Sequence, residues 1–330
     1  MGDSRRALIT GITGQDGSYL SEFLLEKGYE VYGLVRRISS PNVERLAHIQ
    51  SQITFLTGDL LDITSLTHAI GRARPHEIYN LAAQSHVGES FKQPVATAEY
   101  NGLGVLRLLE AIRLSQADIR LYQASSSEMF GNAKVFPQDE STDLQPVSPY
   151  GLSKVFAHNA VQQYREHYGL FACSGICFNH ESPRRSLDFV TRKITSTVAK
   201  IKYGQELVLH LGNTEARRDW GYAGDYVVAM WKMLQMPAPR DYVIATGETH
   251  SILEFASLAF KYGGVEDKCY MDTDPSLFRP TDINTLCGDA TRAKRELGWE
   301  PKTDFKTLVN LMVISDLQRE QQRNNAKLVH

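Results

Sequence analysis

The chain has 330 residues, of which 42% are hydrophobic and 22% charged, a balance that fits a globular protein and excludes a fibrous or disordered one. Its formal net charge of −2 provides no basic field for nucleic acid or an anionic membrane, so local cations must hold any anionic ligand. No apolar stretch reaches the roughly 18 residues that a membrane span needs, and the N-terminal segment lacks a signal-peptide core. We therefore expect a cytoplasmic protein.

The first half of the chain alternates apolar strand-like segments with helical patterns. Strands separated by helices of this length imply right-handed βαβ units and a parallel sheet. The strands are apolar almost throughout, as expected when helices cover both faces of the sheet. The sequence thus predicts an α/β fold with a doubly wound, Rossmann-type parallel sheet. The expected strands are 6–12, 29–35, 53–59, 76–83, 120–127 and 170–178, and the expected helices are 18–28, 63–72, 101–114 and 149–168.

The alternation stops after Asn179. The segment FNHESPRRS is polar and contains proline, which is typical of a loop, and helix and strand patterns then mix. We expect a dinucleotide-binding domain at 1–180 and a smaller, mixed α/β substrate-binding portion at 181–330, interleaved with the last strands of the sheet. The polar segment 318–330 is expected to fray. The mixed patterns are helices at 190–204, 225–235 and 252–263 and strands at 208–212 and 241–247.

Four cysteines, Cys173, Cys177, Cys269 and Cys287, occur in the chain. Cys173 and Cys177 lie four residues apart in the apolar run ACSGICF, on one face of a predicted strand, and neither has a partner at zinc-like spacing. We expect buried free thiols, as suits a reducing compartment, and no metal site.

Three glycines follow the first predicted strand at the start of a helix. Their GxxGxxG spacing permits a tight turn and lets backbone N–H groups approach a pyrophosphate at the helix N-terminus. Glycine turns follow many strands, so the position in a βαβ series is what favours dinucleotide binding. The residues expected to contact the cofactor here are Gly11, Thr13, Gly14, Gln15, Asp16 and Gly17.

The end of the second predicted strand indicates which dinucleotide is bound. An NAD site expects a carboxylate there for the ribose 2′-hydroxyl, whereas this strand ends in Arg36-Arg37-Ile38-Ser39-Ser40. Guanidinium groups match phosphate oxygens in a bidentate manner, which favours the 2′-phosphate of NADP. The alternative is a solvated surface pair.

Polar and small residues close the next two strands. Asp59 and Leu60 follow the third, where a carboxylate could accept from the adenine amino group. The fourth is followed by small residues against which a cofactor can lie, namely Leu81, Ala82, Ala83 and Ser85. Each signal is weak alone, but together they trace the crevice at the carboxyl ends of the strands.

Tyr150 and Lys154 lie at i and i+4 near the start of a predicted helix, so their side chains share one face. We expect the lysine cation and a nicotinamide's positive charge to lower the phenol pKa toward neutrality, making Tyr150 a usable base. A lone Tyr-x-x-x-Lys also fits a surface pair; its place downstream of the glycine turn favours catalysis.

Ser126 and Glu128 end the fifth predicted strand and should face the same crevice. The serine can hydrogen-bond a substrate hydroxyl. A carboxylate beside Met129 and Phe130 could be partly desolvated and act in proton transfer. The alternative for Glu128 is a helix-capping or solvent-facing side chain.

These residues lie in longer motifs that resemble one family. GITGQDGSYL, YNLAAQSHV, YQASSSEMFG, SPYGLSK, FNHESPRR, FVTRKIT, RRDWG and FRP are similar to motifs of the GDP-mannose 4,6-dehydratases, within the extended short-chain dehydrogenases/reductases. The resemblance runs from Arg6 to about Pro301. Related epimerases generally lack an acid at the position of Glu128.

The resemblance implies a reaction and the roles of its residues. Tyr150, supported by Lys154, would take the proton of the sugar's 4-hydroxyl while hydride passes from C4 to NADP. Ser126, where the family usually has threonine, would keep a hydroxyl at that place. Glu128 would remove the C5 proton, water would leave from C6, and the hydride would return there. The product would be GDP-4-keto-6-deoxymannose.

Further ligand contacts are implied by matching motifs. His180 and Arg185 would contact NADP near the nicotinamide and pyrophosphate. The family usually has glutamate where this chain has Asp282, so the ribose contact there has a shorter reach. The residues implied for the GDP-sugar are Ser85, Ser126, Glu128, Asn179, Val190, Lys193, Arg218, Arg279 and Asp282.

Two other functions remain open at this point. A relative acting on another GDP-sugar, such as a GDP-manno-heptose, or one that also reduces the product, would carry the same motifs. A non-catalytic NADP-binding regulator would usually lose the Tyr/Lys pair. The resemblance further implies a homotetramer in which the Arg36–Ser40 loop reaches a neighbouring subunit's cofactor site. The alternative is a dimer joined by helices of the dinucleotide domain, as in many members.

Overall fold

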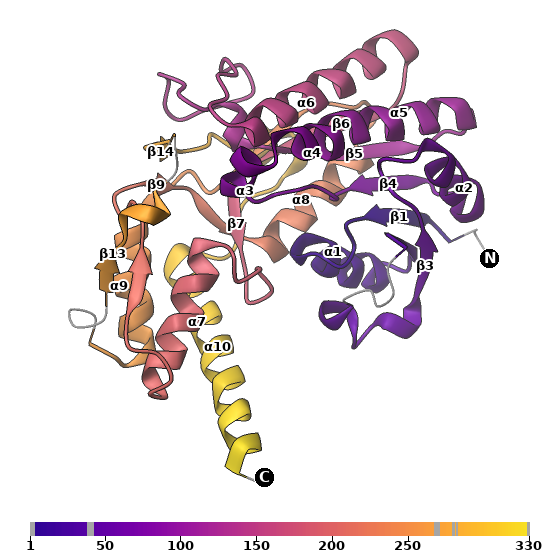
Figure 1. Ribbon diagram of the computed structural model, residues 1–330. Coiled ribbons are helices and arrows are strands. Elements are labelled where there is room, and N and C mark those ends of the chain that lie inside the picture. Colours follow the sequence, from indigo (N-terminus) through magenta and orange to yellow (C-terminus); the bar gives the residue numbers. More distant parts are fainter. Residues whose placement is uncertain (1–3, 38–42, 267–270, 279–280, 282, 329–330) are drawn as a thin grey trace.

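The computed structural model describes residues 4–37, 43–266, 271–278, 281 and 283–328. A seven-stranded sheet in the order β11-β6-β5-β4-β1-β2-β3 forms its centre, and every neighbouring pair is parallel (Figure 1). The order reverses between β1 and β4, the switch point at which such sheets bind ligands. The strands are β1 (Arg6–Thr10), β2 (Glu30–Val35), β3 (Ile53–Thr57), β4 (Glu77–Asn80), β5 (Arg120–Ser126), β6 (Ala172–Cys177) and β11 (Tyr242–Ile244).

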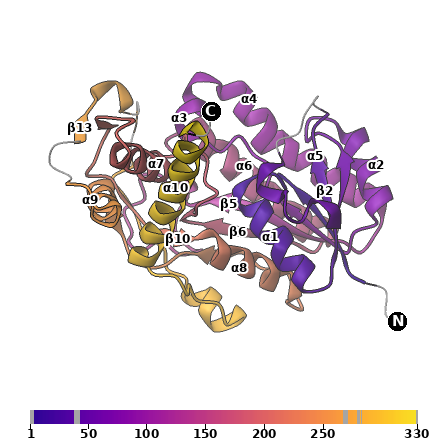
Figure 2. The same ribbon diagram turned by 90° about the horizontal axis from the view of Figure 1, so that it is seen from below.

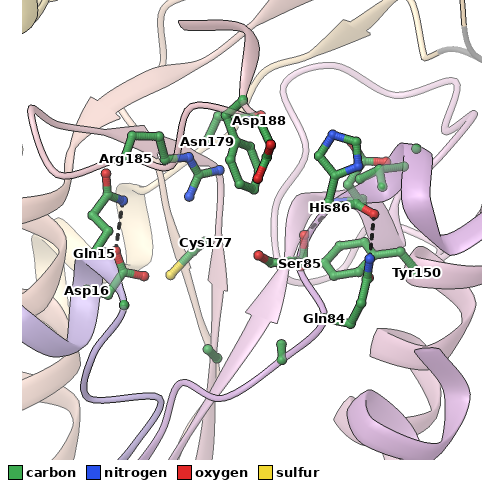
Figure 3. A pocket seen from close by; sticks show the side chains of 18 of the residues that line it. Gln15, Asp16, Gln84, Ser85, His86, Tyr150, Cys177, Asn179, Arg185 and Asp188 are labelled. Carbon is green, nitrogen blue, oxygen red and sulfur yellow. Dashed lines mark hydrogen bonds between the residues drawn. The ribbon is translucent and has the colours of Figure 1, made fainter. Parts of the chain in front are cut away.

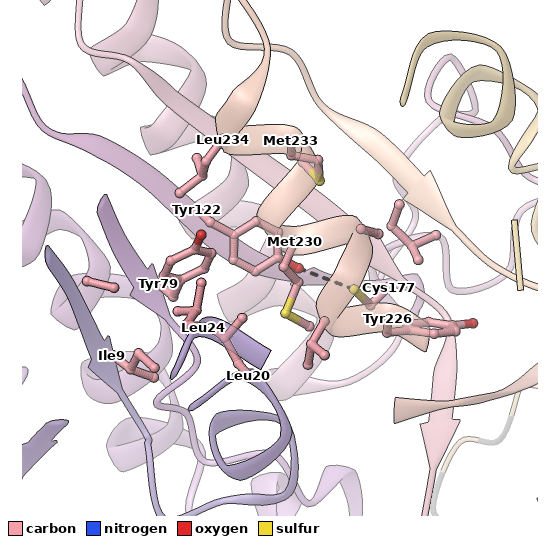
Figure 4. Packing of buried hydrophobic residues seen from close by; sticks show 14 of the residues in the cluster. Ile9, Leu20, Leu24, Tyr79, Tyr122, Cys177, Tyr226, Met230, Met233 and Leu234 are labelled. Atoms are coloured by element: carbon pink, nitrogen blue, oxygen red, sulfur yellow. Dashed lines mark hydrogen bonds between the residues drawn. The ribbon is translucent and has the colours of Figure 1, made fainter. Parts of the chain in front are cut away.

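Helices cover both faces of the sheet, which confirms the predicted doubly wound fold. On one face, α1 and α8 bury Leu20, Leu24 and Met230 against Tyr79 and Tyr122 (Figure 4). On the other, α2, α5 and α6 pack on Leu8, Ile78 and Leu121. This two-sided burial explains why the strands are mostly apolar. The helices are α1 (Gln15–Glu26), α2 (Ile63–Ala73), α3 (Val87–Lys92), α4 (Pro94–Ala98), α5 (Gly104–Ser115), α6 (Pro149–Tyr168) and α8 (Ala223–Gln235).

Three helices from the second half of the chain form a layer beside the carboxyl edge of the sheet, whereas α8 and β11 from the same half belong to the sheet and its cover (Figures 1 and 2). The three helices of the layer bury a separate apolar cluster around Phe255, Phe260 and Met312. They are α7 (Val190–Lys202), α9 (Ile252–Gly263) and α10 (Phe305–Leu328). The short strands are β7 (Asn179–Glu181) with β10 (Trp220–Tyr222), β9 (Arg217–Arg218) with β12 (His250–Ser251) and β14 (Thr285–Leu286), and β8 (Leu209–Leu211) with β13 (Met271–Thr273).

The helix expected around 101–114 is present: a π-helical turn at Glu99–Leu103 leads directly into α5 at Gly104. Two other local expectations are wrong. The segment expected as a loop opens with β7, which pairs with β10, a partner too distant in sequence for local patterns to reveal. The segment expected to fray is helical to Leu328, and Gln205 donates a hydrogen bond to Asn324 along it.

A buried ion pair connects α7 with α10. Arg192 donates to both carboxylate oxygens of Asp316, which also accepts from Thr195. The same guanidinium donates to the backbone carbonyls of Pro183 and Arg185, at 3.0 and 2.8 Å. The C-terminal helix therefore supports the loop between β7 and α7.

Within the described ranges, no helix is both long and apolar enough to cross a membrane. Cys173 and Cys177 are buried free thiols, as predicted. Cys269 lies outside the described residues. No group of three or more potential metal ligands occurs among the residues that the structure describes.

Candidate active site

A cavity of about 1060 Å³ lies at the carboxyl edge of the sheet, between the sheet and the helical layer. Every predicted site residue that the structure describes lines it. Arg279 and Asp282, and the part of the Arg36–Ser40 loop from Ile38 onward, lie outside the described residues. The predicted residues at the cavity are Gly11, Thr13, Gly14, Gln15, Asp16, Gly17, Arg36, Asp59, Leu60, Leu81, Ala82, Ala83, Ser85, Ser126, Glu128, Tyr150, Lys154, Asn179, His180, Arg185, Val190, Lys193 and Arg218.

The glycine turn joins β1 to α1 with almost no space between backbones. Gly11 has φ +67°, and a Cβ there would lie 2.7 Å from the backbone nitrogen of Ala82. A Cβ on Gly17 would lie 2.5 Å from the carbonyl oxygen of Gly11. Larger residues at either position would force β1, α1 and the end of β4 apart. The turn thereby leaves the N-terminus of the 12-residue helix α1 open to the cavity, where it can attract an anion.

Asp16 and His180 form a partly buried ion pair between the glycine turn and β7. The Nε2 atom of His180 lies 2.8 Å from the Asp16 carboxylate, while Nδ1 lies 2.8 Å from the Phe178 carbonyl. The imidazole stacks on Tyr226, with ring centroids 4.6 Å apart. Gln15 strengthens the junction by donating to Asp16 and to the His180 carbonyl, at 3.0 Å each (Figure 3).

Arg185 extends from the β7–α7 loop into the cavity (Figure 3). Its Nε lies 3.2 Å from the carboxylate of Glu181, and its guanidinium lies 3.5 Å from the centroid of the Phe189 ring. These contacts hold the Arg185 guanidinium over the glycine turn while engaging only part of it. Such a cation can bind the pyrophosphate or nicotinamide part of a dinucleotide.

Ser126, Glu128 and Tyr150 meet where β5 ends and α6 begins. Ser148 caps α6 by accepting from the Gly151 N–H at 3.0 Å, which places Tyr150 in the first helical turn. Glu128 is buried and its backbone N–H donates to the Ser126 hydroxyl at 3.2 Å. The carboxyl, hydroxyl and phenol groups therefore line one part of the cavity.

The prediction that Lys154 and a nicotinamide's positive charge together lower the phenol pKa stays a prediction, because the pKa values here are those of the chain alone. The net pKa of Tyr150 is raised to about 12: burial is the largest cause, a hydrogen bond from Ser126 opposes the rise, and the charge of Glu128 adds to it. Burial also lowers the pKa of Lys154 to about 8. The Lys154 Nζ lies 5.7 Å from the centroid of the Tyr150 ring and donates to the Ala124 carbonyl at 2.8 Å.

Arg36 and Arg218 bring positive charge to different parts of the cavity. Arg36 follows β2, and its guanidinium lies 5.9 Å from the Tyr100 ring centroid. Arg218 is buried on β9 and donates to the Ile283 carbonyl at 2.7 Å. Neighbouring Asp219 accepts hydrogen bonds from the backbone nitrogens of Thr246, Gly247 and Gly288, which fixes the strand that carries Arg218.

Sequence reasoning missed several lining residues. Cys177 was expected only as a buried thiol, yet its side chain reaches the cavity floor (Figure 3). His86 caps α3 by accepting from the Glu89 N–H, and its ring meets Phe189 edge-on at 5.7 Å. His86 lies within the motif YNLAAQSHV, which was the available signal for it. Nothing local signals that Cys177 faces a cavity.

The family model described as GDP-mannose 4,6 dehydratase matches residues 8–312. The chain belongs to this family. It is 53% identical to GDP-mannose 4,6 dehydratase 1 of Arabidopsis thaliana, over 94% of this chain and 90% of that protein. It is 48% identical to the human GDP-mannose 4,6 dehydratase, over 99% of this chain and 95% of that protein. The resemblance inferred from the motifs is confirmed, and with it the prediction of a hydro-lyase.

Solved structures confirm the fold of this GDP-mannose 4,6-dehydratase family member. A UDP-glucose 4-epimerase from Thermotoga maritima, solved with UDP-glucose, superimposes with a TM-score of 0.85 at 27% identity, covering 96% of this chain and 99% of that one. A dTDP-glucose 4,6-dehydratase from Streptomyces venezuelae, solved with NAD bound, gives a TM-score of 0.85 at 23% identity, covering 96% and 98%.

The Asp16–His180 pair makes stability and titration pH-dependent in a defined direction. Burial lowers the pKa of His180, but the charge and hydrogen bond of Asp16 outweigh it, so the pKa lies above the ordinary 6.5. Burial likewise opposes ionisation of Asp16, yet His180 holds that pKa below the ordinary 3.8. The histidine's contribution is lost as pH rises through its raised pKa. The aspartate's contribution is lost as pH falls through its depressed one.

We therefore expect Asp16→Asn to bring the pKa of His180 below 6.5, because burial then acts without the carboxylate. Imidazole NMR titration measures this shift. The loss of thermal stability should be largest between the two ordinary pKa values, 3.8 and 6.5, and should shrink at alkaline pH. Asp272→Asn, which breaks the exposed pair with His210, serves as the control and should leave the unfolding temperature unchanged. A His180 pKa that stays above 6.5 in Asp16→Asn would contradict the assignment.

Proposed function

We propose that this protein is an NADP-dependent GDP-mannose 4,6-dehydratase that forms GDP-4-keto-6-deoxymannose with loss of water. The observation that carries this proposal is Glu128, a buried carboxylate in the same cavity as Tyr150 and Lys154. Hydride transfer alone needs only the tyrosine and lysine. An elimination needs a second base for the C5 proton, and Glu128 is placed to be that base.

The cavity fits a nicotinamide dinucleotide. Gly11 and Gly17 have no Cβ, which lets the turn pack tightly against the neighbouring backbone. The N-terminus of α1 therefore opens into the cavity, where it could bind the pyrophosphate of a dinucleotide. Arg36, with no carboxylate at the end of β2, favours the 2′-phosphate of NADP. When bound, NADP supplies the acceptor for the C4 hydride and later returns that hydride to C6.

Tyr150 is the proposed base for the 4-hydroxyl. Its high pKa in the chain alone means that the phenolate must be stabilised by positive charge, which Lys154 and the oxidised nicotinamide would supply. The Ser126 hydroxyl already lowers that pKa through a hydrogen bond, and it can also orient the sugar's 4-hydroxyl. Ser126 and Lys154 thus prepare Tyr150 to accept the proton as the C4 hydride departs.

Glu128 acts in the second half of the reaction. A ketone at C4 acidifies the C5 hydrogen, and Glu128 takes that proton. Glu128 passes that proton to the C6 hydroxyl, which leaves as water. The double bond between C5 and C6 then accepts the returning hydride at C6, and the proton that Tyr150 took from the 4-hydroxyl is delivered to C5. No net change in redox state results, because the hydride taken from C4 is the hydride delivered to C6.

The GDP moiety would bind on the side of the cavity formed by the second half of the chain. We propose that Asn179, Lys193 and Arg218 hold the diphosphate, that Val190 contacts the base, and that Ser85 contacts the sugar. Arg279 and Asp282 are proposed to complete this site. The division into a cofactor domain at 1–180 and a substrate portion at 181–330 is part of the same proposal.

Incubation with GDP-mannose, without added reductant, tests the reaction directly. We expect a product lighter by one water, detected by mass spectrometry, whereas UDP- and dTDP-sugars should remain unchanged. Glu128→Gln should lower kcat by about 10²- to 10⁴-fold, because it removes the C5 base, while GDP-mannose binding persists. Glu300→Gln, an exposed carboxylate paired with Lys294, is the matched control and should keep full activity. Full elimination by Glu128→Gln would disprove the assigned role.

Arg36→Ala tests the choice of dinucleotide. Loss of a charge-assisted contact to the 2′-phosphate should weaken NADP binding by about tenfold to a hundredfold and leave NAD binding unchanged. Calorimetric titration of both dinucleotides measures the difference. Arg72→Ala, which removes an exposed arginine on α2 that does not line the cavity, should change neither affinity. Equal weakening of NAD and NADP by Arg36→Ala would assign this arginine to a shared part of the cofactor.

We further propose a cytoplasmic homotetramer in which the Arg36–Ser40 loop reaches the cofactor site of a neighbouring subunit. The support is the family resemblance together with the place of Arg36 at the edge of the cavity. Sedimentation of the purified protein should give four times the mass of one chain. A mass of two chains would contradict the tetramer.

A further inference from the structure

A row of buried polar side chains crosses three adjacent strands just below the cavity. Thr10, Asn80 and Gln123 stand directly opposite one another in the register of β1, β4 and β5. The Thr10 hydroxyl donates to the Asn80 carbonyl oxygen at 2.5 Å, and the Asn80 amide donates to the Gln123 carbonyl oxygen at 2.7 Å. Each of the three residues is at most 1% exposed.

The row ends at the proposed catalytic lysine. The Gln123 amide donates to the backbone carbonyl of Ala124 at 3.0 Å, and Lys154 Nζ donates to that same oxygen at 2.8 Å. At the other end, Thr10 accepts from the backbone N–H of Ala82, which lines the cavity, at 3.1 Å. A continuous buried chain of hydrogen bonds therefore runs from the cavity wall after β4 to Lys154.

Each link in this chain fixes the next. Since Asn80 presents its NH₂ to Gln123, the Gln123 side chain must present its own NH₂ to Ala124, and a flipped amide would set two carbonyl oxygens together. A buried donor left without a partner costs about 1–3 kcal/mol, so the row resists rearrangement. A fully satisfied network of this kind rigidifies its surroundings.

We propose that Gln123 is a positioning residue that places Lys154 by fixing the Ala124 carbonyl, and that the Thr10–Asn80–Gln123 row connects this placement to the cofactor-lining backbone at Ala82. The proposal rests on the role of Lys154 in the proposed function. Gln123 itself does not line the cavity, so it acts through Lys154 and not on substrate.

The charged and titratable groups that face Lys154 come from several elements. Tyr150 lies on its own helix, Cys177 ends β6, and Asp16 opens α1. The largest influence, burial, lowers the lysine pKa to about 8, and the charges of Cys177 and Asp16 raise it. The Gln123 amide adds the positive end of a dipole beside the same carbonyl oxygen, which disfavours the ammonium form. Removing that amide should therefore raise the lysine pKa, and any loosening of the side chain toward solvent would raise it too.

Gln123→Met keeps the length of the side chain and removes both hydrogen bonds. We expect kcat for GDP-mannose to fall by about tenfold to a hundredfold, as misplacement of a catalytic group does, with KM unchanged. The basic limb of the pH–rate profile should move upward with the lysine pKa. Thr10→Val, at the far end of the row, should cause a smaller fall in kcat and a smaller shift of the basic limb. This variant tests the proposal even if Gln123→Met fails to fold.

Tyr79→Phe is the matched control. Tyr79 precedes Asn80 on β4, is fully buried, and donates to Glu77 at 2.7 Å on the opposite face of the sheet. The substitution Tyr79→Phe removes one buried hydrogen bond from β4 and leaves the hydrogen bonds of Thr10, Asn80 and Gln123 intact. If Tyr79→Phe lowers kcat as much as Gln123→Met at equal loss of stability, the effect is structural and the proposal fails.

A measurement independent of turnover completes the test. The pKa of Lys154, followed through the ¹³Cε resonance of labelled lysine and assigned with Lys154→Met, should rise in Gln123→Met and stay unchanged in Tyr79→Phe. An unchanged pKa together with unchanged kcat in Gln123→Met overturns the positioning role. Full activity of Lys154→Met would instead disprove the lysine's part in the proposed function, while the titration would still judge whether Gln123 positions it.

Discussion

The ion pair between Asp16 and His180 joins the two halves of the molecule at the site. Asp16 stands in the first turn of the helix that follows the glycine turn, and His180 stands on the short strand that opens the second half. Their contact is partly buried and is supported by Gln15, which also accepts from the Ser182 hydroxyl. Because of this junction, the loop that carries Arg185 lies over the glycine turn and closes the cavity on that side.

On the side of the cavity that carries Tyr150 and Lys154, burial determines which form of each side chain is favoured. It raises the pKa of Tyr150 and lowers that of Lys154, so both groups are driven toward their neutral forms. A pair of this kind responds strongly to any charge brought between them. The polar row beneath the cavity matters because Lys154 lies in a mostly apolar setting. Its amine depends on the Ala124 carbonyl, which Gln123 also contacts, to keep its place.

Much of this could be predicted from the sequence, because it depends on local patterns. Glycine spacing, apolar strands and the Tyr150/Lys154 pair on one helix face each follow from a few adjacent residues. Other features could not be predicted, since they depend on partners far along the chain. The contact of residue 16 with residue 180, the pairing of β7 with β10 and the exposure of Cys177 to the cavity arise only when the sheet is assembled. The high pKa of Tyr150 in the chain alone is another such feature, because it arises mainly from burial in the assembled structure.

Arg192 gives the far end of the chain an unexpected importance. Its guanidinium donates to Asp316 through Nε and to the carbonyls of Pro183 and Arg185 through Nη1. Helix α10 thereby supports the loop that lies over the glycine turn. Shortening the chain from its C-terminal end is therefore not neutral once it reaches residue 316. A protein trimmed to before Asp316 would leave the Arg192 guanidinium without its carboxylate partner and would remove a support of the loop that carries Arg185.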